Sequence, residues 1–155
     1  MANWANSKMF ASYLVGTMNR SLLFDIDTDT MKAALYNNSI TPDNTVSAAN
    51  SAYNAGQWAN TNEVSHTAHW DAGGRTIASL TVVGSGTTVT VDATDTASAD
   101  SATTLTANYG CLVYDDTIAA KNGFCYNYFG GAQQVTSGSY TIVWNGSGIA
   151  SLSVA

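Results

Sequence analysis

The stretch Tyr140-Thr141-Ile142-Val143-Trp144-Asn145-Gly146-Ser147-Gly148-Ile149 belongs to a run of short apolar segments that extends from Thr104 to Ala155. Apolar and β-branched residues alternate there with small polar ones, and Asn-Gly marks a tight turn, so the run predicts antiparallel strands. Charge is scarce in it: Lys121 is its one basic residue, and Asp115 and Asp116 are its acidic ones. Strong strand signals with so little charge are more typical of a structural surface than of a catalytic site.

Working outward from this run, a period close to two predicts strands over most of the chain after residue 73. The expected strands are Thr30–Tyr36, Thr76–Val83, Thr87–Ala93, Leu105–Tyr114, Gly123–Phe129, Ser139–Asn145 and Ile149–Val154. About seven short strands with glycine-bearing turns, such as Gly84-Ser85-Gly86, predict a mainly β fold, an antiparallel β-sandwich or barrel that is jelly-roll-like. We expect this β-sandwich domain to span residues 22–155.

Two other segments carry weaker helix signals. Residues 1–21 are expected to form an N-terminal arm or helix, because apolar residues at positions 10, 14 and 18 share one helical face from about Ser7 to Asn19. Asn37–Gln57 is a long polar loop, with a helical turn expected near Val46–Ala55.

The N-terminal segment is also the first candidate contact surface. Four of its residues are more apolar than a free tail should be, and we expect them to contact a partner protein or another copy of the chain: Trp4, Met9, Phe10 and Tyr13. The alternative is that they cover the open end of the sandwich.

The composition excludes several classes of partner. Charged residues make up 10% of the chain, the formal net charge is −6 and the pI is about 4.3. Because binding to nucleic acid or to an anionic membrane requires clustered Lys and Arg, neither is expected as a partner. There is no apolar run of about 20 residues and no secretory signal pattern, so we expect synthesis in a cytosol.

Cys111 and Cys125 flank the turn around Asp115–Asn122. If Tyr114 lies opposite Asn122, the two cysteines face each other across a hairpin and point to one face. Two small buried thiols are the favoured interpretation, because unpaired cysteine is among the most buried residue types. A cross-strand disulfide is the alternative.

No catalytic residue, metal or cofactor is expected, and the chain is not predicted to be an enzyme. His66 and His69 lack a nearby third ligand, so surface histidines are the preferred interpretation over a metal site. Asp25, Asp27 and Asp29 resemble the start of a calcium-binding loop, but Thr30 and Tyr36 stand where that loop needs Gly and an acid, so a polar turn is expected. A set of aromatic residues could line a sugar-binding face, although about half of them should be core: Tyr109, Tyr114, Phe124, Tyr126, Tyr128 and Phe129.

Four blocks of the chain, in order, resemble a family of tailed-bacteriophage virion structural proteins. They are Asp25–Tyr36, Asn62–Ser65 with Ala72–Thr76, Leu105–Thr117 and Trp144–Ile149, which together span residues 22 to 154.

The resemblance implies a capsid decoration, or cement, protein that binds the outer surface of the assembled head and stabilises it. It implies the major capsid protein as partner, a homo-oligomer with a trimer favoured, and location on the virion capsid surface after synthesis in the host cytoplasm. The alternatives are a phage tail or connector structural protein, and a carbohydrate-binding module of the virion surface.

Overall fold

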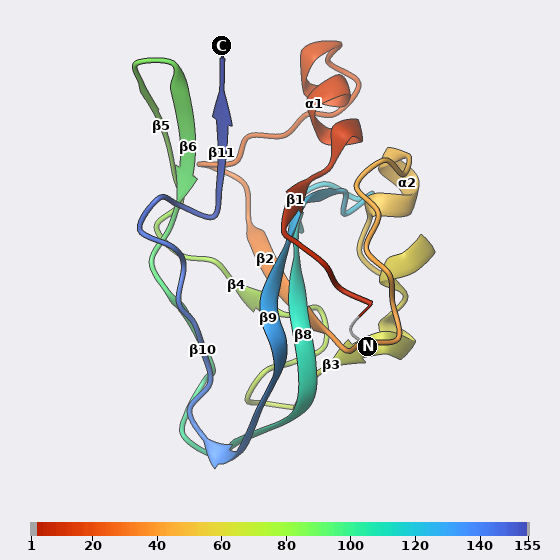
Figure 1. The fold of residues 1–155 in the computed structure, drawn as a ribbon, viewed down its shortest axis with the longest axis vertical. Helices are drawn as coiled ribbons and strands as arrows, with labels where there is room; N and C mark the ends of the chain where they lie inside the picture. The colour runs from red at the N-terminus through yellow and green to blue at the C-terminus, as the bar shows by residue number, and fades with distance from the viewer. Residues whose placement is uncertain (1–2, 155) are drawn as a thin grey trace.

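The computed structural model describes residues 3–154, which form one large antiparallel sheet and two smaller sheets (Figure 1). The large sheet has the spatial order β1–β9–β8–β2–β3, and β4 pairs with β2 alongside β3. Its strands are β1 (Lys8–Met9), β2 (Met31–Tyr36), β3 (Glu63–Val64), β4 (Arg75–Thr76), β8 (Thr103–Asp115) and β9 (Gly123–Gly138).

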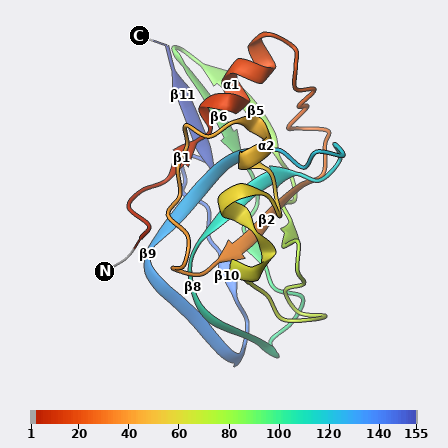
Figure 2. The same cartoon turned by 90° about the vertical axis from the view of Figure 1, so that its right-hand side faces the viewer.

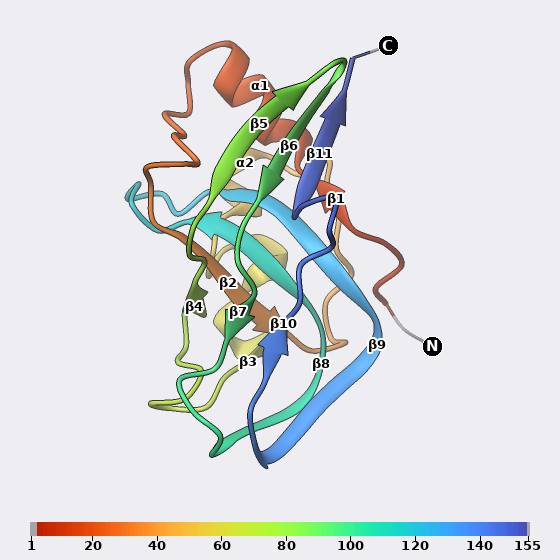
Figure 3. The ribbon, with the colours of Figure 1, turned by 90° about the vertical axis from the view of Figure 1, so that its left-hand side faces the viewer.

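The smaller sheets lie on one face of the large sheet, as Figure 3 shows. One pairs β7 (Thr96–Ala97) with β10 (Thr141–Ile142), and the other has the order β11–β6–β5. The three strands of the latter are β5 (Thr81–Ser85), β6 (Thr88–Asp92) and β11 (Ala150–Ser153).

The opposite face of the large sheet is covered by the segment between β2 and β3 (Figure 2). This segment contains helix α2 (Ala48–Ser51) and the 3-10 turns η1 (Gly56–Trp58) and η2 (Asn60–Asn62). Helix α2 lies within the predicted helical turn, and the Ser47 hydroxyl caps it by accepting a hydrogen bond from the Asn50 N–H. The long polar stretch is therefore an ordered cover.

The mainly β fold with antiparallel sheets and a short N-terminal helix is confirmed. The arrangement is compatible with a sandwich and is not a closed barrel. The large sheet forms the middle layer, because both of its faces are buried against other parts of the chain.

Two hydrophobic clusters, one on each face of the large sheet, form the core. Alternate residues of β2 divide between them: Met31, Ala33 and Leu35 face the small sheets, whereas Ala34 and Tyr36 face the other cover. This explains why the sequence of β2 is apolar at consecutive positions, as expected for a strand buried on both sides.

The N-terminal segment is part of this structure. Helix α1 spans Ala11–Met18, so the helix expected from about Ser7 begins four residues later than predicted. The residues before it form β1 instead, where Lys8 and Met9 pair with Tyr126 and Cys125 of β9. Backbone pairing to a distant strand overrides the helical periodicity at these two positions.

Strand β9 is much longer than the predicted strand Gly123–Phe129. Asn108 pairs with Gln133 and Gly110 with Tyr128, so β9 contains extra residues between these two pairs. Gly130 and Gly131 lie in this bulge with φ angles of 79° and 156°. Glycine adopts such angles at low cost, so the strand bends here and continues to Gly138.

The expected strand Thr76–Val83 is wrong as a single element. Its first residue belongs to β4 in the large sheet, and its last residues belong to β5 in a small sheet. Ser79, with a φ of 56°, lies between them. The chain crosses from one layer to the other at this point, which a continuous strand could not do.

The hairpin of β8 and β9 places the cysteines in a different register from the predicted one. Cys125 pairs with Val113 and Cys111 with Asn127. Both cysteines nevertheless belong to the same core cluster, and both are free and buried, as the favoured interpretation predicted. Burial raises the pKa of the Cys111 thiol to about 12 and also raises that of Cys125.

Gly110 offers a direct test of how the N-terminal segment is attached to the sheet. A Cβ at Gly110 would collide with the Trp4 ring and with the Asn127 carbonyl oxygen. We expect Gly110→Ala to lower the free energy of unfolding by about 2–4 kcal/mol, because neither the buried ring nor the backbone can move freely. Gly146→Ala is the matched control, because a Cβ there meets no atom within 4 Å. Urea unfolding of both variants measures the difference, and equal stabilities would contradict the packing.

Candidate binding surface

The four predicted contact residues divide into two pairs. Trp4 and Phe10 are core residues, with exposed fractions of 2% and 0%. Their rings pack around Trp58, with centroid distances of 5.8 and 6.0 Å, and the Trp4 indole N–H donates to the Asn37 carbonyl oxygen at 3.0 Å. These two rings therefore belong to the core cluster around Trp58 and are not on the surface.

Met9 and Tyr13 are only partly buried, and they line an apolar groove of about 550 Å³ between α1 and the sheet β11–β6–β5. We call the outer part of this sheet, residues 81–91 and 150–154, the flap. In Figure 1 the flap and α1 project from the same end of the molecule. Residues from both walls line the groove: Leu14, Thr17 and Met18 from α1, and Val82, Val89, Val91 and Leu152 from the flap.

Strand pairing determines which side chains of the flap face the groove. Val82 pairs with Val91, and Val89 pairs with Leu152, so these side chains share the inner face of the flap. Val83 alternates to the outer face, beside serine and threonine residues. The inner face is thus apolar, yet Val82 and Leu152 remain 43% and 42% exposed because α1 covers them only in part.

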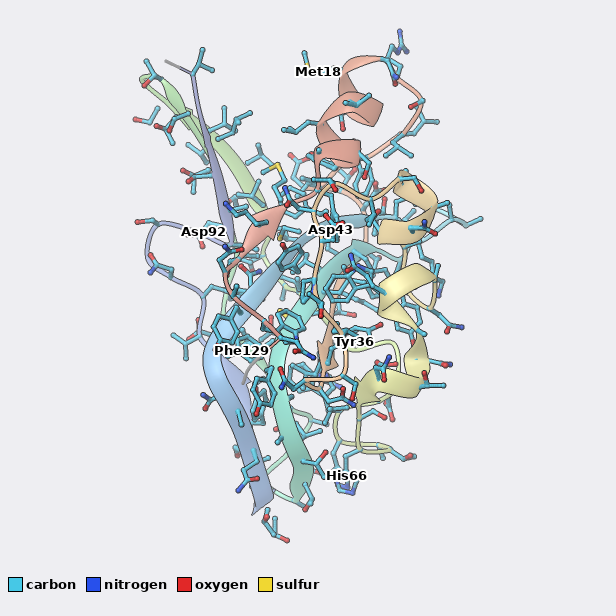
Figure 4. All side chains as sticks on the ribbon, turned by 45° about the vertical axis from the view of Figure 1, so that its right-hand side comes forward. Met18, Tyr36, Asp43, His66, Asp92 and Phe129 are labelled. Atoms are coloured by element: carbon cyan, nitrogen blue, oxygen red, sulfur yellow. The ribbon has the colours of Figure 1, made fainter. Side chains whose placement is uncertain are left out.

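The C-terminal end of α1 adds to this apolar surface. Met18, in the last turn, is 85% exposed, and Figure 4 shows it at the far end of the molecule from His66. Leu23, in the segment that follows, is also exposed. Apolar side chains in such a position mark an interaction surface more often than a catalytic one.

Charge is nearly absent around the groove. Residues 76–91 and 122–155 contain no Asp, Glu, Lys, Arg or His. The acids that line the groove are Asp25 and Asp27. A hydrogen bond between them raises the pKa of the exposed Asp27 carboxyl.

A second groove, of about 560 Å³, lies between β9 and the segment that follows β10. Tyr128, Phe129 and Trp144 line it together with amide side chains, including Asn127 and Gln133. Of the aromatic set considered for sugar binding, Tyr114, Phe124 and Tyr126 are core residues, which confirms that about half of the set is buried.

The histidines lie together but are held by local contacts. Their rings stack with centroids 4.4 Å apart, His69 Nδ1 lies 2.7 Å from the Asp100 carboxylate, and the Thr104 N–H donates to His66 Nδ1. Hydrogen bonds from the Ala102 N–H and from His69 lower the pKa of Asp100. These contacts fasten the loop before β8.

The acidic stretch Asp25–Asp29 forms the expected turn. The Asp25 carbonyl oxygen accepts from the Thr28 and Asp29 N–H groups, and an Asp29 carboxylate oxygen accepts from the Asp25 N–H at 2.8 Å. Within residues 3–154, no group of three or more His, Cys, Asp or Glu side chains is placed to hold a metal ion.

A half-buried carboxylate, Glu63, ties the cover to the large sheet. It accepts from the Tyr53 hydroxyl at 2.8 Å and from the Gly73 N–H at 2.7 Å. Burial raises the pKa of Glu63 despite these two hydrogen bonds. The Tyr53 ring stacks on Tyr114, whose hydroxyl donates to the Gly73 carbonyl oxygen, so this network is structural.

Asp116 joins the β8–β9 turn to strand β2. Its carboxylate lies 2.8 Å from the Lys32 ammonium and 2.7 Å from the Lys121 ammonium. Burial acts to raise the pKa of Asp116, but the hydrogen bonds from Lys121 and Lys32 outweigh it, and the pKa is lowered.

The search for similar proteins gives no family for this chain. No protein-family model, curated protein or solved structure matches it. Within residues 3–154, no helix has the length and apolar character needed to cross a bilayer.

The sequence predicts two residues of this apolar surface and does not predict the flap. Met9 and Tyr13 were expected as contact residues and do border the groove. The alternation of Val89 and Val91 was recognised as a strand, but not as one wall of a groove. The available signal was the absence of charge from Thr76 to Val91.

The two ion pairs of Asp116 predict how stability changes with pH. Because the pKa of Asp116 is lower in the folded protein, its contribution is complete above the unfolded-state value of about 3.9 and is lost as the pH falls through the folded-state value. We expect Asp116→Asn to reduce the free energy of unfolding by about 1–2 kcal/mol at pH 7. The deficit should stay nearly constant from pH 7 down to about pH 5 and shrink as the pH falls from there toward 3.

Urea unfolding at several pH values measures this difference. Asp92→Asn is the control, because Asp92 forms no ion pair among the described residues. A deficit of Asp116→Asn that stays constant down to pH 3 would contradict the assignment.

Proposed function

We propose that this chain is a non-enzymatic bacteriophage virion protein that decorates the outer surface of the assembled head and stabilises it. Its partner is the major capsid protein, and it binds as a homo-oligomer, with a trimer favoured. The protein is made in the host cytoplasm and resides on the capsid surface. The resemblance of four blocks in the sequence to tailed-phage structural proteins supports this assignment.

The structural observation that carries the proposal is the contrast between the apolar, uncharged flap and an otherwise acidic molecule. The flap exposes valine and leucine side chains, whereas the residues that give the formal charge of −6 lie in other segments. A protein of this kind offers two different surfaces for assembly. It is suited to joining other subunits in a shell.

The mechanism is mechanical. Each oligomer bridges neighbouring capsid subunits, and its binding free energy is available only to the assembled shell, so the shell is stabilised by mass action. Several identical contacts made at once give avidity, and a trimer meets a three-fold position of an icosahedral lattice with three such contacts. The acidic surface suits a basic patch of the capsid, which speeds encounter more than it raises affinity.

The large sheet serves this role as a rigid support. Its two covered faces keep the β8–β9 hairpin fixed, and the flap extends from that support. Tyr114, Phe124 and Tyr126 belong to the core, so fewer aromatic rings are left to stack on a sugar. We therefore prefer the capsid-decoration role to a carbohydrate-binding role.

Quantitative mass spectrometry of purified particles of the encoding phage tests the proposal. We expect the chain at hundreds of copies per particle, because a decoration protein occupies repeated sites on the shell. Six or twelve copies would assign it to the tail or connector instead. Absence from particles would contradict the virion assignment altogether.

A further inference from the structure

The flap is an unusual sheet because both of its outer strands are open. β5 and β11 lie on the two sides of β6, and each presents one row of backbone N–H and C=O groups outward. Proteins usually protect such edges with charged side chains, proline or a covering element. β5 and β11 contain Thr, Val, Gly, Ser, Ala and Leu only.

The inner face of the flap is apolar and incompletely covered. Val82, Val89 and Leu152 line the groove, and Val154 follows Leu152 on the same face by alternation. Met18 lines the same groove from the α1 side and is also highly exposed. Exposed apolar side chains gathered in this way mark an interaction surface.

The charge distribution favours a second copy of the chain as the occupant. Two acidic molecules repel each other unless they meet through uncharged surface. The flap, residues 81–91 and 150–154, contains no charged residue, and Asp92 follows it at the end of β6 that joins the rest of the fold. A basic capsid patch would gain no electrostatic attraction from such a surface. The flap of a second copy brings no charged residue to Asp25 and Asp27, the acids that line the groove, so no like-charge pair forms there.

The groove that would receive the flap of a second copy has a volume of about 550 Å³ and lies between α1 and the flap. Valine, leucine and methionine side chains line its walls, so they match the apolar face of the flap that would enter it.

We propose that neighbouring copies of the chain join through the flap, with the inner face of one flap packing into the groove of the next copy. Reciprocal packing of two copies closes a two-fold dimer, and head-to-tail packing closes a ring such as a trimer. This inference locates the contact that holds together the oligomer of the proposed function, on which it rests. The contact itself requires no capsid.

Sedimentation velocity of the full-length purified chain over a wide concentration range tests this contact. We expect a concentration-dependent dimer or trimer. Val82→Asp and Leu152→Asp should each weaken association at least about a hundredfold, because they bury an unpaired carboxylate in the contact. Val83→Asp is the matched control, since Val83 is the neighbouring residue of β5 on the outer face and should change the dissociation constant less than about threefold.

Circular dichroism shows whether each variant folds. If Val82→Asp does not fold, Leu152→Asp, which lies on a different strand, tests the contact in its place. A wild-type chain that is monomeric at every concentration would overturn the inference. The inference would also be overturned if Val83→Asp weakened association as much as Val82→Asp does. It would equally be overturned if the inner-face variants stayed oligomeric and lost only their binding to particles. A monomer found at hundreds of copies on particles would overturn this contact alone, whereas an oligomer absent from particles would overturn the virion assignment alone.

Discussion

Strands β8 and β9 pair along most of their lengths of 13 and 16 residues, and the other strands of the large sheet are built outward from that hairpin. β2 joins its β8 side and β1 joins its β9 side, so the large sheet grows from it in both directions. Side chains then leave the hairpin on both faces and nucleate two separate cores. Because both faces are filled, the sheet is a fixed support from which α1 and the flap project.

Local sequence pattern was sufficient where an element is stabilised by its own alternation. β2, β6 and β8 were each predicted to within about two residues, since apolar residues recur there at the spacing that a strand requires. It was insufficient where a distant partner decides the conformation. Lys8 and Met9 follow a helical pattern but pair with β9. The predicted strand ends at Phe129, whereas β9 bends at Gly130-Gly131 and continues, and the chain changes layer at Ser79. None of these outcomes has a local cause that the sequence displays.

The candidate surface shows the same limit. Composition predicted an uncharged surface, and Met9 and Tyr13 were placed on a contact region, but Trp4 and Phe10 are buried because the 37–62 segment supplies Trp58 and completes an aromatic cluster around them. The groove itself was not predictable, because its walls come from α1, the β5–β6 hairpin and β11, which are far apart in the chain. Only the fold brings Met18, Val82 and Leu152 to one place.

In the proposed association, a sheet that is buried on both faces supports a flap that stays open until a second copy covers it. Native-state hydrogen exchange of the chain, followed from dilute to concentrated solution, measures this most directly. We expect the amides of β2 and β8 to be the slowest to exchange at all concentrations. The amides of β5 and β11 should exchange fast in dilute solution and become protected as the concentration rises. Amides of β5 and β11 that exchange at one rate throughout, whether fast or slow, would contradict the account.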